Sequence, residues 1–226
     1  MVQIYSLLLL VIFIFFSGTF SLALAGTAKS YKQSFSWRQS AANSGNPIAQ
    51  YELGQMLEFG VGKKIDKKIA ANWYILAAKQ GHVLAQVRLA SMYYNGEGLK
   101  RDLTEAAKWF HLSAEAGIAT SQYNYAVILE TGAGRKKNLA KAAIYFEKAA
   151  RNGLVEAQIS LAMLYARGAG VKLNFQQALV WLEVARAGGA IVPKEIYRHL
   201  QTAIPPDKIL KIRNQAKLLA QQTIKN

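Results

Sequence analysis

The apolar residues of the chain recur at helical spacing. One stripe, at i, i+4, i+7 and i+8 within residues 82–95, consists of Ala85, Leu89, Met92 and Tyr93. This spacing places the four side chains on one face of a helix. Gly96 predicts the end of that helix, because glycine adopts positive φ without a Cβ clash. A second stripe over residues 102–116 predicts a second helix, which Asp102 would cap at its N-terminus. The two stripes together predict a helical hairpin.

This hairpin recurs every 36 residues. Glycine occupies residues 45, 81, 117, 153 and 189, and other positions repeat in the same register. Four repeats, 45–80, 81–116, 117–152 and 153–188, follow one another without insertions, and a half repeat, 36–44, precedes them. Because no single hairpin can bury both of its faces, neighbours must stack. Residues 36–189 are therefore predicted to form an all-α fold, an α/α superhelical solenoid of helix-turn-helix repeats.

The two ends of the chain leave the repeat pattern. Residues 1–25 carry no charged side chain and end in Ala23-Leu24-Ala25, which predicts a signal peptide cleaved after Ala25. An uncleaved membrane anchor is the alternative, and a linker, 26–35, follows. Residues 190–226 are expected to form C-terminal capping helices, one over 194–203 and one running from a cap at Asp207 to about residue 222. The predicted apolar face of the last helix consists of Ile209, Leu210, Ile212, Ala216, Leu218 and Leu219.

The first helices of the hairpins carry a face that differs between repeats. Residues 49, 53, 56 and 57 and their equivalents are nearly constant, whereas 48, 52, 55 and 59 and their equivalents diverge and share a face of their own. We call it the divergent face. Solenoids bind partners along a concave surface, so we expect this face to contact a protein partner, with solvation or packing between repeats as the alternatives. The predicted contacts are Glu52, Gln55, Phe59, Arg88, Ser91, Asn95, Asn124, Val127, Ser160, Met163 and Arg167.

The loops inside the hairpins are rich in basic residues, within a formal net charge of +15. They contain Lys63, Lys64, Lys67, Lys68, Lys100, Arg101, Arg135, Lys136, Lys137 and Lys172. Stacking would place these loops along one edge, the basic edge, which could meet an anionic envelope surface or an acidic partner. Merely solvated loops are the alternative. No aromatic residues are interleaved as stacking platforms, so nucleic acid is not the expected partner.

The sequence offers no set of residues with the spacing of a catalytic or metal site. Cysteine is absent, which excludes disulfides, thiol nucleophiles and cysteine ligands. The three histidines, His82, His111 and His199, are not spaced as metal ligands on a helix. The recurring Gly-x-Gly is explained by turn geometry, and it lacks the spacing of a phosphate-binding loop. We therefore expect no enzymatic activity, no cofactor and no small-molecule substrate.

The repeat motif resembles a known family. In the second repeat it reads Leu89-Ala90-x-Met92-Tyr93-x-x-Gly96-x-Gly98, then Asp102-x-x-x-Ala106-x-x-Trp109 and Ala114-x-x-Gly117. This is similar to the Sel1-like repeat, a relative of the tetratricopeptide repeat, over about residues 36–189. The resemblance implies an adaptor or scaffold in protein–protein interactions, and bacterial members are often exported. One secreted branch is cysteine-rich, and nothing specific to it carries over to a chain without cysteine.

These observations lead to one functional hypothesis and one alternative. The chain is expected to be an exported, periplasmic or secreted, non-catalytic scaffold that binds a protein partner through the concave face of the solenoid. The alternative is an envelope-associated protein that the basic edge attaches to an anionic membrane or glycan.

Overall fold

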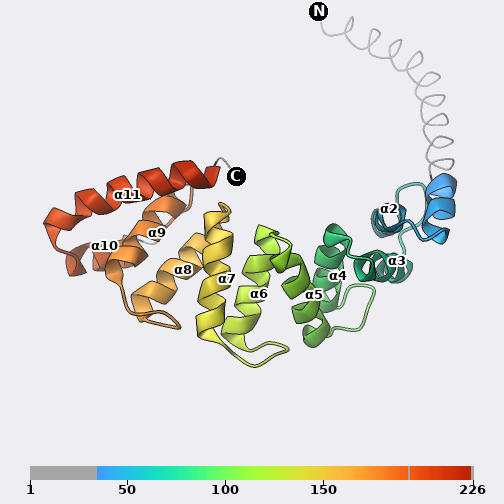
Figure 1. Ribbon diagram of the computed structural model, residues 1–226, viewed down its shortest axis with the longest axis horizontal. Helices are drawn as coiled ribbons and strands as arrows, with labels where there is room; N and C mark the ends of the chain where they lie inside the picture. Colours follow the sequence, from blue (N-terminus) through green and yellow to red (C-terminus); the bar gives the residue numbers. More distant parts are fainter. Residues whose placement is uncertain (1–34, 193, 225–226) are drawn as a thin grey trace, which may run out of the picture. The chain divides into compact units, whose positions relative to one another are not determined.

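The computed structural model describes residues 35–192 and 194–224 of the chain. Within these ranges every regular element is an α-helix (Figure 1). The predicted signal peptide and all but the last residue of the predicted linker lie outside the described residues. The chain divides into two compact units, Met1–Ala85 and Gln86–Asn226, and stacked helices form both.

The first unit contains one complete hairpin. A helix over residues 35–43 is followed by α2 (Pro47–Phe59) and α3 (Lys67–Lys79), which pack against each other. Tyr74 of α3 is fully buried, and its hydroxyl donates a hydrogen bond of 2.8 Å to the buried Glu58 carboxylate. A Cβ at Gly54 would lie 2.7 Å from the Tyr74 ring. Glycine therefore stands at this position, where the other repeats have alanine, because the ring occupies the space.

The second unit continues the same pattern through three more hairpins. Its helices are α4 (Val83–Asn95), α5 (Leu103–Glu115), α6 (Ala119–Thr131), α7 (Leu139–Arg151), α8 (Val155–Arg167) and α9 (Phe175–Ala187). From α5 to α9 each helix packs against the next, within hairpins and between them. The buried stripe predicted for α5, which includes Trp109 and Phe110, lies in the core. The all-α solenoid of helical hairpins is confirmed.

Helix caps fix the ends of the hairpin helices as the sequence predicts. The Asp102 carboxylate accepts hydrogen bonds from the amides of Thr104 and Glu105, at 2.9 and 3.0 Å. Asp66, Asn138 and Asn174 cap α3, α7 and α9 in the same way. Each of these cap residues also donates its own amide to a carbonyl of the preceding helix, as Asp102 does to Tyr93 at 3.0 Å. The cap and this bond together close the loop of each hairpin.

In the second unit, the second glycine of two Gly-x-Gly turns allows successive hairpins to approach. Gly134 has a φ of 77°, and a Cβ there would lie 2.2 Å from the carbonyl oxygen of Leu103, the first residue of α5. A Cβ at Gly170 would lie 2.3 Å from the carbonyl oxygen of Leu139, the first residue of α7. The sequence predicts the reversal of the chain at these glycines but not this contact between repeats, which only glycine permits.

A recurring glutamine links successive hairpins within the second unit. The side-chain amides of Gln122 and Gln158 donate to the carbonyls of Ala114 and Ala150, both at 3.2 Å, and both glutamines are buried. The Gln122 side-chain oxygen in turn accepts a bond of 3.1 Å from Asn152. The constant glutamine is therefore explained by packing between repeats rather than by binding.

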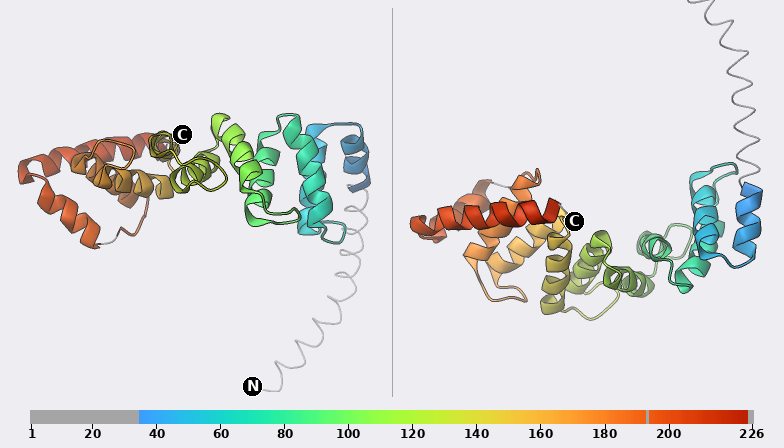
Figure 2. Two further views of the ribbon diagram at one scale, coloured as in Figure 1. Left: turned by 90° about the horizontal axis from the view of Figure 1, so that it is seen from below. Right: turned by 45° about the horizontal axis from the view of Figure 1, so that its top comes forward.

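The C-terminal helices cover the end of the solenoid. Helices α10 (Lys194–Ala203) and α11 (Pro206–Ile224) pack against α9, and α11 extends across the last helices in every view (Figures 1 and 2). The buried Glu183 of α9 binds Tyr197 of α10, and Arg213 of α11 at 3.3 Å. The predicted cap at residue 207 is wrong: α11 begins at Pro206, whose fixed φ suits the first helical position, and Asp207 lies in the first turn.

The predicted apolar face of α11 is partly wrong. Ile212 and Ala216 are buried, but Leu210 and Leu218 are 69% and 63% exposed. The buried stripe continues instead through Ala220 and Thr223. The carbonyl oxygen of Thr223 would lie 2.9 Å from a Cβ at Gly153. Small side chains lie in this contact because the helix approaches the solenoid closely.

Candidate functional site: a groove between adjacent repeats

The divergent face lies at the solvent-facing side of the first helices. In the second unit Asn95 and Arg167 are exposed. The half-buried members are Arg88, Ser91, Asn124, Val127, Ser160 and Met163. The constant residues of the same helices, such as Leu89 and Leu161, are fully buried. The separation of constant and divergent positions in the sequence therefore corresponds to core and surface in the second unit.

Two adjacent repeats of the second unit bring divergent residues into one pocket. The pocket has a volume of about 370 Å³ and lies on α4, α5 and α6. Its lining residues are Ser91, Tyr94, Asn95, Phe110, Tyr123, Asn124 and Val127. We call it the α4–α6 groove. Four of its residues are among the partner contacts predicted from the sequence, and they come from two repeats.

The chemistry of the α4–α6 groove combines aromatic walls with polar amides. The Tyr94 and Phe110 rings meet edge to face, with centroids 6.5 Å apart, and Tyr123 lies against the buried Phe146 at 5.6 Å. Aromatic rings supply large apolar contact areas. The side-chain amides of Asn95 and Asn124 can each donate and accept hydrogen bonds. The arrangement suits a peptide segment, whose backbone offers both donors and acceptors beside apolar side chains.

Sequence comparison of the repeats missed the aromatic residues of the groove. Tyr94 stands where the other repeats have Glu58, Glu130 and Ala166, so its position also diverges. It lies outside the four positions of the divergent face because it is one residue away from Asn95 along the helix. A wider search for aromatic residues at divergent positions could have found it.

Other members of the divergent face do not join this groove. In the first unit, Glu52 forms an ion pair with Arg38 at 2.6 Å, and Phe59 is 62% exposed. Gln55 donates to the Tyr51 hydroxyl at 3.0 Å. In α8, Arg167 pairs with Glu130 of the preceding repeat at 3.3 Å. Ser160 and Met163 lie on the same helix, outside the groove.

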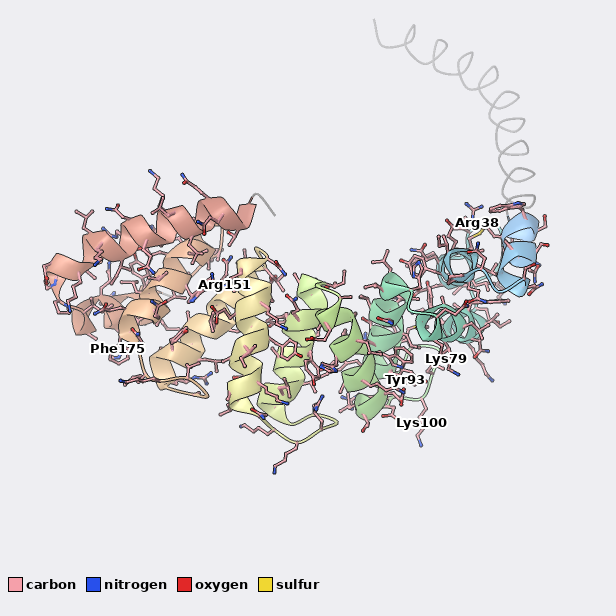
Figure 3. All side chains as sticks on the ribbon, viewed as in Figure 1. Arg38, Lys79, Tyr93, Lys100, Arg151 and Phe175 are labelled. Atoms are coloured by element: carbon pink, nitrogen blue, oxygen red, sulfur yellow. The ribbon has the colours of Figure 1, made fainter. Side chains whose placement is uncertain are left out.

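The predicted basic residues are all exposed, and those of the second unit follow one edge. Lys63, Lys64, Lys67 and Lys68 belong to the first unit, and Lys100, Arg101, Arg135, Lys136, Lys137 and Lys172 to the second. Gly134 lies against Leu103, at the start of α5, and Gly170 lies against Leu139, at the start of α7. Each of these loops therefore lies beside the loop of the preceding hairpin. An open hollow of about 780 Å³ there includes Tyr93, Lys100 and Arg101 among its lining residues. Figure 3 shows Lys100 at the hairpin loop, extending away from the ribbon.

Several of the predicted basic residues also contact other groups of the protein. Arg101 donates to the Tyr94 carbonyl at 3.0 Å. Arg135 donates to the Tyr125 hydroxyl and lies 5.1 Å from the centre of that ring. In the first unit, Lys63 lies 5.1 Å from the Phe35 ring. These residues therefore also contribute to packing.

The histidines have structural surroundings. His82 accepts a bond of 3.2 Å from the Ala85 amide and stacks on Tyr51 at 4.6 Å, so it caps α4. His111 lies 4.7 Å from the Tyr125 ring and 6.1 Å from the Tyr145 ring. Burial lowers the pKa of both histidines. Among the described residues, no group of acidic residues and histidines could hold a metal ion.

The family of the chain follows from its repeats. The model of the Sel1 repeat matches residues 18–46, 47–82, 83–118, 119–154 and 155–189. The chain therefore belongs to the Sel1 repeat family, whose members generally act as non-catalytic scaffolds that bind proteins. The last four matched ranges begin 36 residues apart, as the repeats found above do. The first begins inside the predicted signal peptide, whose cleavage stays a prediction.

Solved structures share this fold. One is a Sel1 repeat protein from Oxalobacter formigenes, with 31% identity and a TM-score of 0.66 over 75% of this chain and 50% of that one. Another is c5321, a protective antigen of uropathogenic Escherichia coli strains that displays an SLR fold; its identity is 28% and its TM-score 0.51 over 86% of this chain and 49% of that one. The chain thus spans about half the length of each. No curated protein sequence matches it.

No helix among the described residues is both long and apolar enough to cross a membrane.

Proposed function

We propose that the chain is an exported scaffold that binds a peptide segment of a protein partner in the α4–α6 groove. The observation that carries this proposal is the convergence of Ser91, Asn95, Asn124 and Val127 in one pocket. The positions of these four residues differ between repeats, unlike the buried positions that packing keeps constant. Their gathering from two repeats around aromatic walls supports a binding role.

Site-specific cross-linking tests the groove. A photoreactive amino acid placed at Val127 should cross-link a partner in the native source, and the cross-linked segment can be identified by mass spectrometry. The same probe at Leu112, a partly exposed residue of α5 outside the groove, serves as the control. The identified segment, made as a synthetic peptide, is then titrated against the purified protein.

The double variant Asn95→Ala/Asn124→Ala should weaken the binding of that peptide by about tenfold or more, because each lost amide hydrogen bond contributes about 1 kcal/mol. Asn214→Ala/Gln221→Ala removes two exposed amides of α11 and should leave the affinity unchanged. Equal cross-linking from Val127 and Leu112, or unchanged affinity in the groove variant, would refute the proposal.

Export is the second part of the proposal. The support is the uncharged apolar segment that ends in Ala23-Leu24-Ala25. The mass and N-terminal sequence of the protein from fractionated cells should show a mature chain that begins at Gly26 outside the cytoplasm. A chain with residues 1–25 intact in the membrane fraction would favour the uncleaved anchor instead.

Attachment to an anionic envelope surface is a second candidate function. The glycine contacts that set the loops of the second unit in series favour it, because they place Lys100, Lys136 and Lys137 on consecutive turns. Clustered cations attract anionic surfaces in a salt-dependent way.

A further inference from the structure

An open pocket with three basic residues lies where the solenoid meets its C-terminal helices. It has a volume of about 450 Å³ and is lined by Arg186, Val192, Lys194, Tyr197, Arg198 and Gln201. The lining residues include three cations and no carboxylate. We call it the α9–α10 pocket. It is separate from the α4–α6 groove and shares no residue with it.

Arg186 distinguishes the last repeat from the others. The equivalent residues Ala78, Ala114 and Ala150 are at most 2% exposed. The Arg186 side chain is 59% exposed. Only a small side chain fits where another hairpin stacks, and α9 is followed by α10 instead. The end of the repeat array thus gives position 186 room for a guanidinium group at the rim of the pocket.

The buried Glu183 fixes the walls of the pocket. Its carboxylate accepts hydrogen bonds from Arg186 at 3.0 Å, from Arg213 at 3.3 Å and from the Tyr197 hydroxyl. Burial and the bond to Glu183 raise the pKa of Tyr197, so the phenol stays a neutral donor at physiological pH. The Tyr197 ring is thereby held as an apolar wall. The negative charge of Glu183 is matched by its own donors and lies outside the lining of the pocket.

Lys194 and Arg198 are the positively charged lining residues that are not paired with Glu183. They are four residues apart on α10, which places them on one face of the helix. Both are exposed. Like charges at this spacing repel each other, whereas the charge of Arg186 is paired with Glu183. A bound carboxylate would relieve this repulsion and would accept charge-assisted hydrogen bonds.

We propose that the α9–α10 pocket binds an acidic segment of a protein partner. The pocket is open to solvent, so a side chain of a passing peptide can enter it. Val192 and the Tyr197 ring offer apolar contacts beside the cations, and the Gln201 amide can bond to a peptide backbone. The inference rests on the proposed scaffold role for the nature of the ligand, but not on the α4–α6 groove.

A labelled oligoglutamate peptide tests the proposal with the full chain, and fluorescence anisotropy measures its affinity. The double variant Lys194→Gln/Arg198→Gln should weaken binding by about tenfold, as expected when two partly solvated charge pairs are lost. Lys208→Gln/Lys211→Gln removes the same charge from exposed positions of α11 and should change the affinity by less than about twofold. Both double variants should keep the unfolding midpoint, because their residues are exposed.

The remaining measurements separate this site from other anion binding. An oligoglutamine peptide should not bind, and inorganic phosphate should not displace oligoglutamate at equal concentration. An equal loss in both double variants would overturn the proposal in favour of general attraction by charge. Displacement of oligoglutamate by phosphate would also overturn it. So would binding of the chain to phosphatidylglycerol vesicles, if Lys194→Gln/Arg198→Gln abolishes that binding and Lys208→Gln/Lys211→Gln does not. The groove variant Asn95→Ala/Asn124→Ala should bind oligoglutamate normally, so failure of the groove proposal is distinguishable from failure here.

Discussion

At the scale of single residues, the junction between the second and third repeats contains a network of polar aromatic residues. Tyr125 and Tyr145 stand where the other repeats have leucine and tryptophan. The Tyr145 hydroxyl donates to Glu115 at 2.7 Å, and Lys148 pairs with the same carboxylate at 3.2 Å. The bond to Tyr145, and then that to Lys148, lowers the pKa of Glu115. His111 lies against both tyrosine rings in this network.

His111 should make stability depend on pH. Burial, with Arg135, Lys141 and Lys148 nearby, lowers its pKa below the ordinary 6.5, although Glu115 acts in the opposite direction. The unfolded chain then binds a proton that the folded chain does not, so stability falls as pH decreases from about 6.5 towards the folded value. The urea midpoint should therefore decrease less on acidification in His111→Gln than in the wild type. Equal decreases would show that His111 contributes nothing to this dependence.

A second residue-scale prediction concerns the glutamine links between repeats. Gln50 and Gln122 accept bonds from Gln80 and Asn152, but the equivalent partner of Gln158 is Gly188. The side-chain oxygen of Gln158 is buried without a hydrogen-bond partner. Gly188→Asn should supply the missing donor and stabilise the chain by about 1 kcal/mol in urea unfolding.

The matched control for this change is Gly188→Ala, which adds a Cβ without a donor. Gly188 has a φ of −80°, so alanine introduces no left-handed strain. Its Cβ would lie 3.0 Å from Val155 Cγ2, and both variants share that crowding. The difference between them therefore isolates the hydrogen bond. If the Gly188→Asn variant is no more stable than the Gly188→Ala variant, the hydrogen bond to Gln158 does not form.

At the scale of elements, the sequence predicts the helices well where a boundary has a local cause. Gly132 and Gly168 end α6 and α8 with positive φ, and aspartate or asparagine begins the second helices. The face of α11 was harder to predict, because nothing in its own sequence shows which strip meets α9. Leucine is more hydrophobic than alanine, yet the close approach of the helices favours Ala216 over Leu218 in the contact.

This distinction gives an element-scale prediction. Ala216→Asp places a charge in the contact between α11 and the solenoid and should cost about 3 kcal/mol or more, because an unpaired charge is buried. It should also increase amide exchange in α9. Leu218→Asp, two residues further along, places the same charge at a position that is 63% exposed and should cost less than about 0.5 kcal/mol. Similar costs would show that α11 packs through the leucine face.

At the scale of the whole molecule, the repeats made the class of protein predictable but only part of the candidate site. Divergence among repeats singled out Ser91, Asn95, Asn124 and Val127 because constant residues are held by packing. It could not show that residues of α4 and α6 meet in one pocket, since that depends on how hairpins stack. The α9–α10 pocket lies further from prediction, because five of its six lining residues come from outside the repeat frame and only Arg186 lies within it.

The formal net charge of +15 alone would bind the chain to any polyanion, so only a matched comparison can detect a basic edge. Lys100→Gln/Lys136→Gln/Lys137→Gln removes three charges from consecutive loops of the second unit, and Lys208→Gln/Lys211→Gln/Lys217→Gln removes three from α11; all six residues are exposed. If clustered loop charges bind anionic surfaces together, the loop variant should elute from heparin at lower salt than the α11 variant, because clustered cations reinforce one another within a Debye length of about 8 Å. Identical elution would mean that heparin binds positive charges regardless of their position on the protein. Attachment through the basic edge would then lose its support.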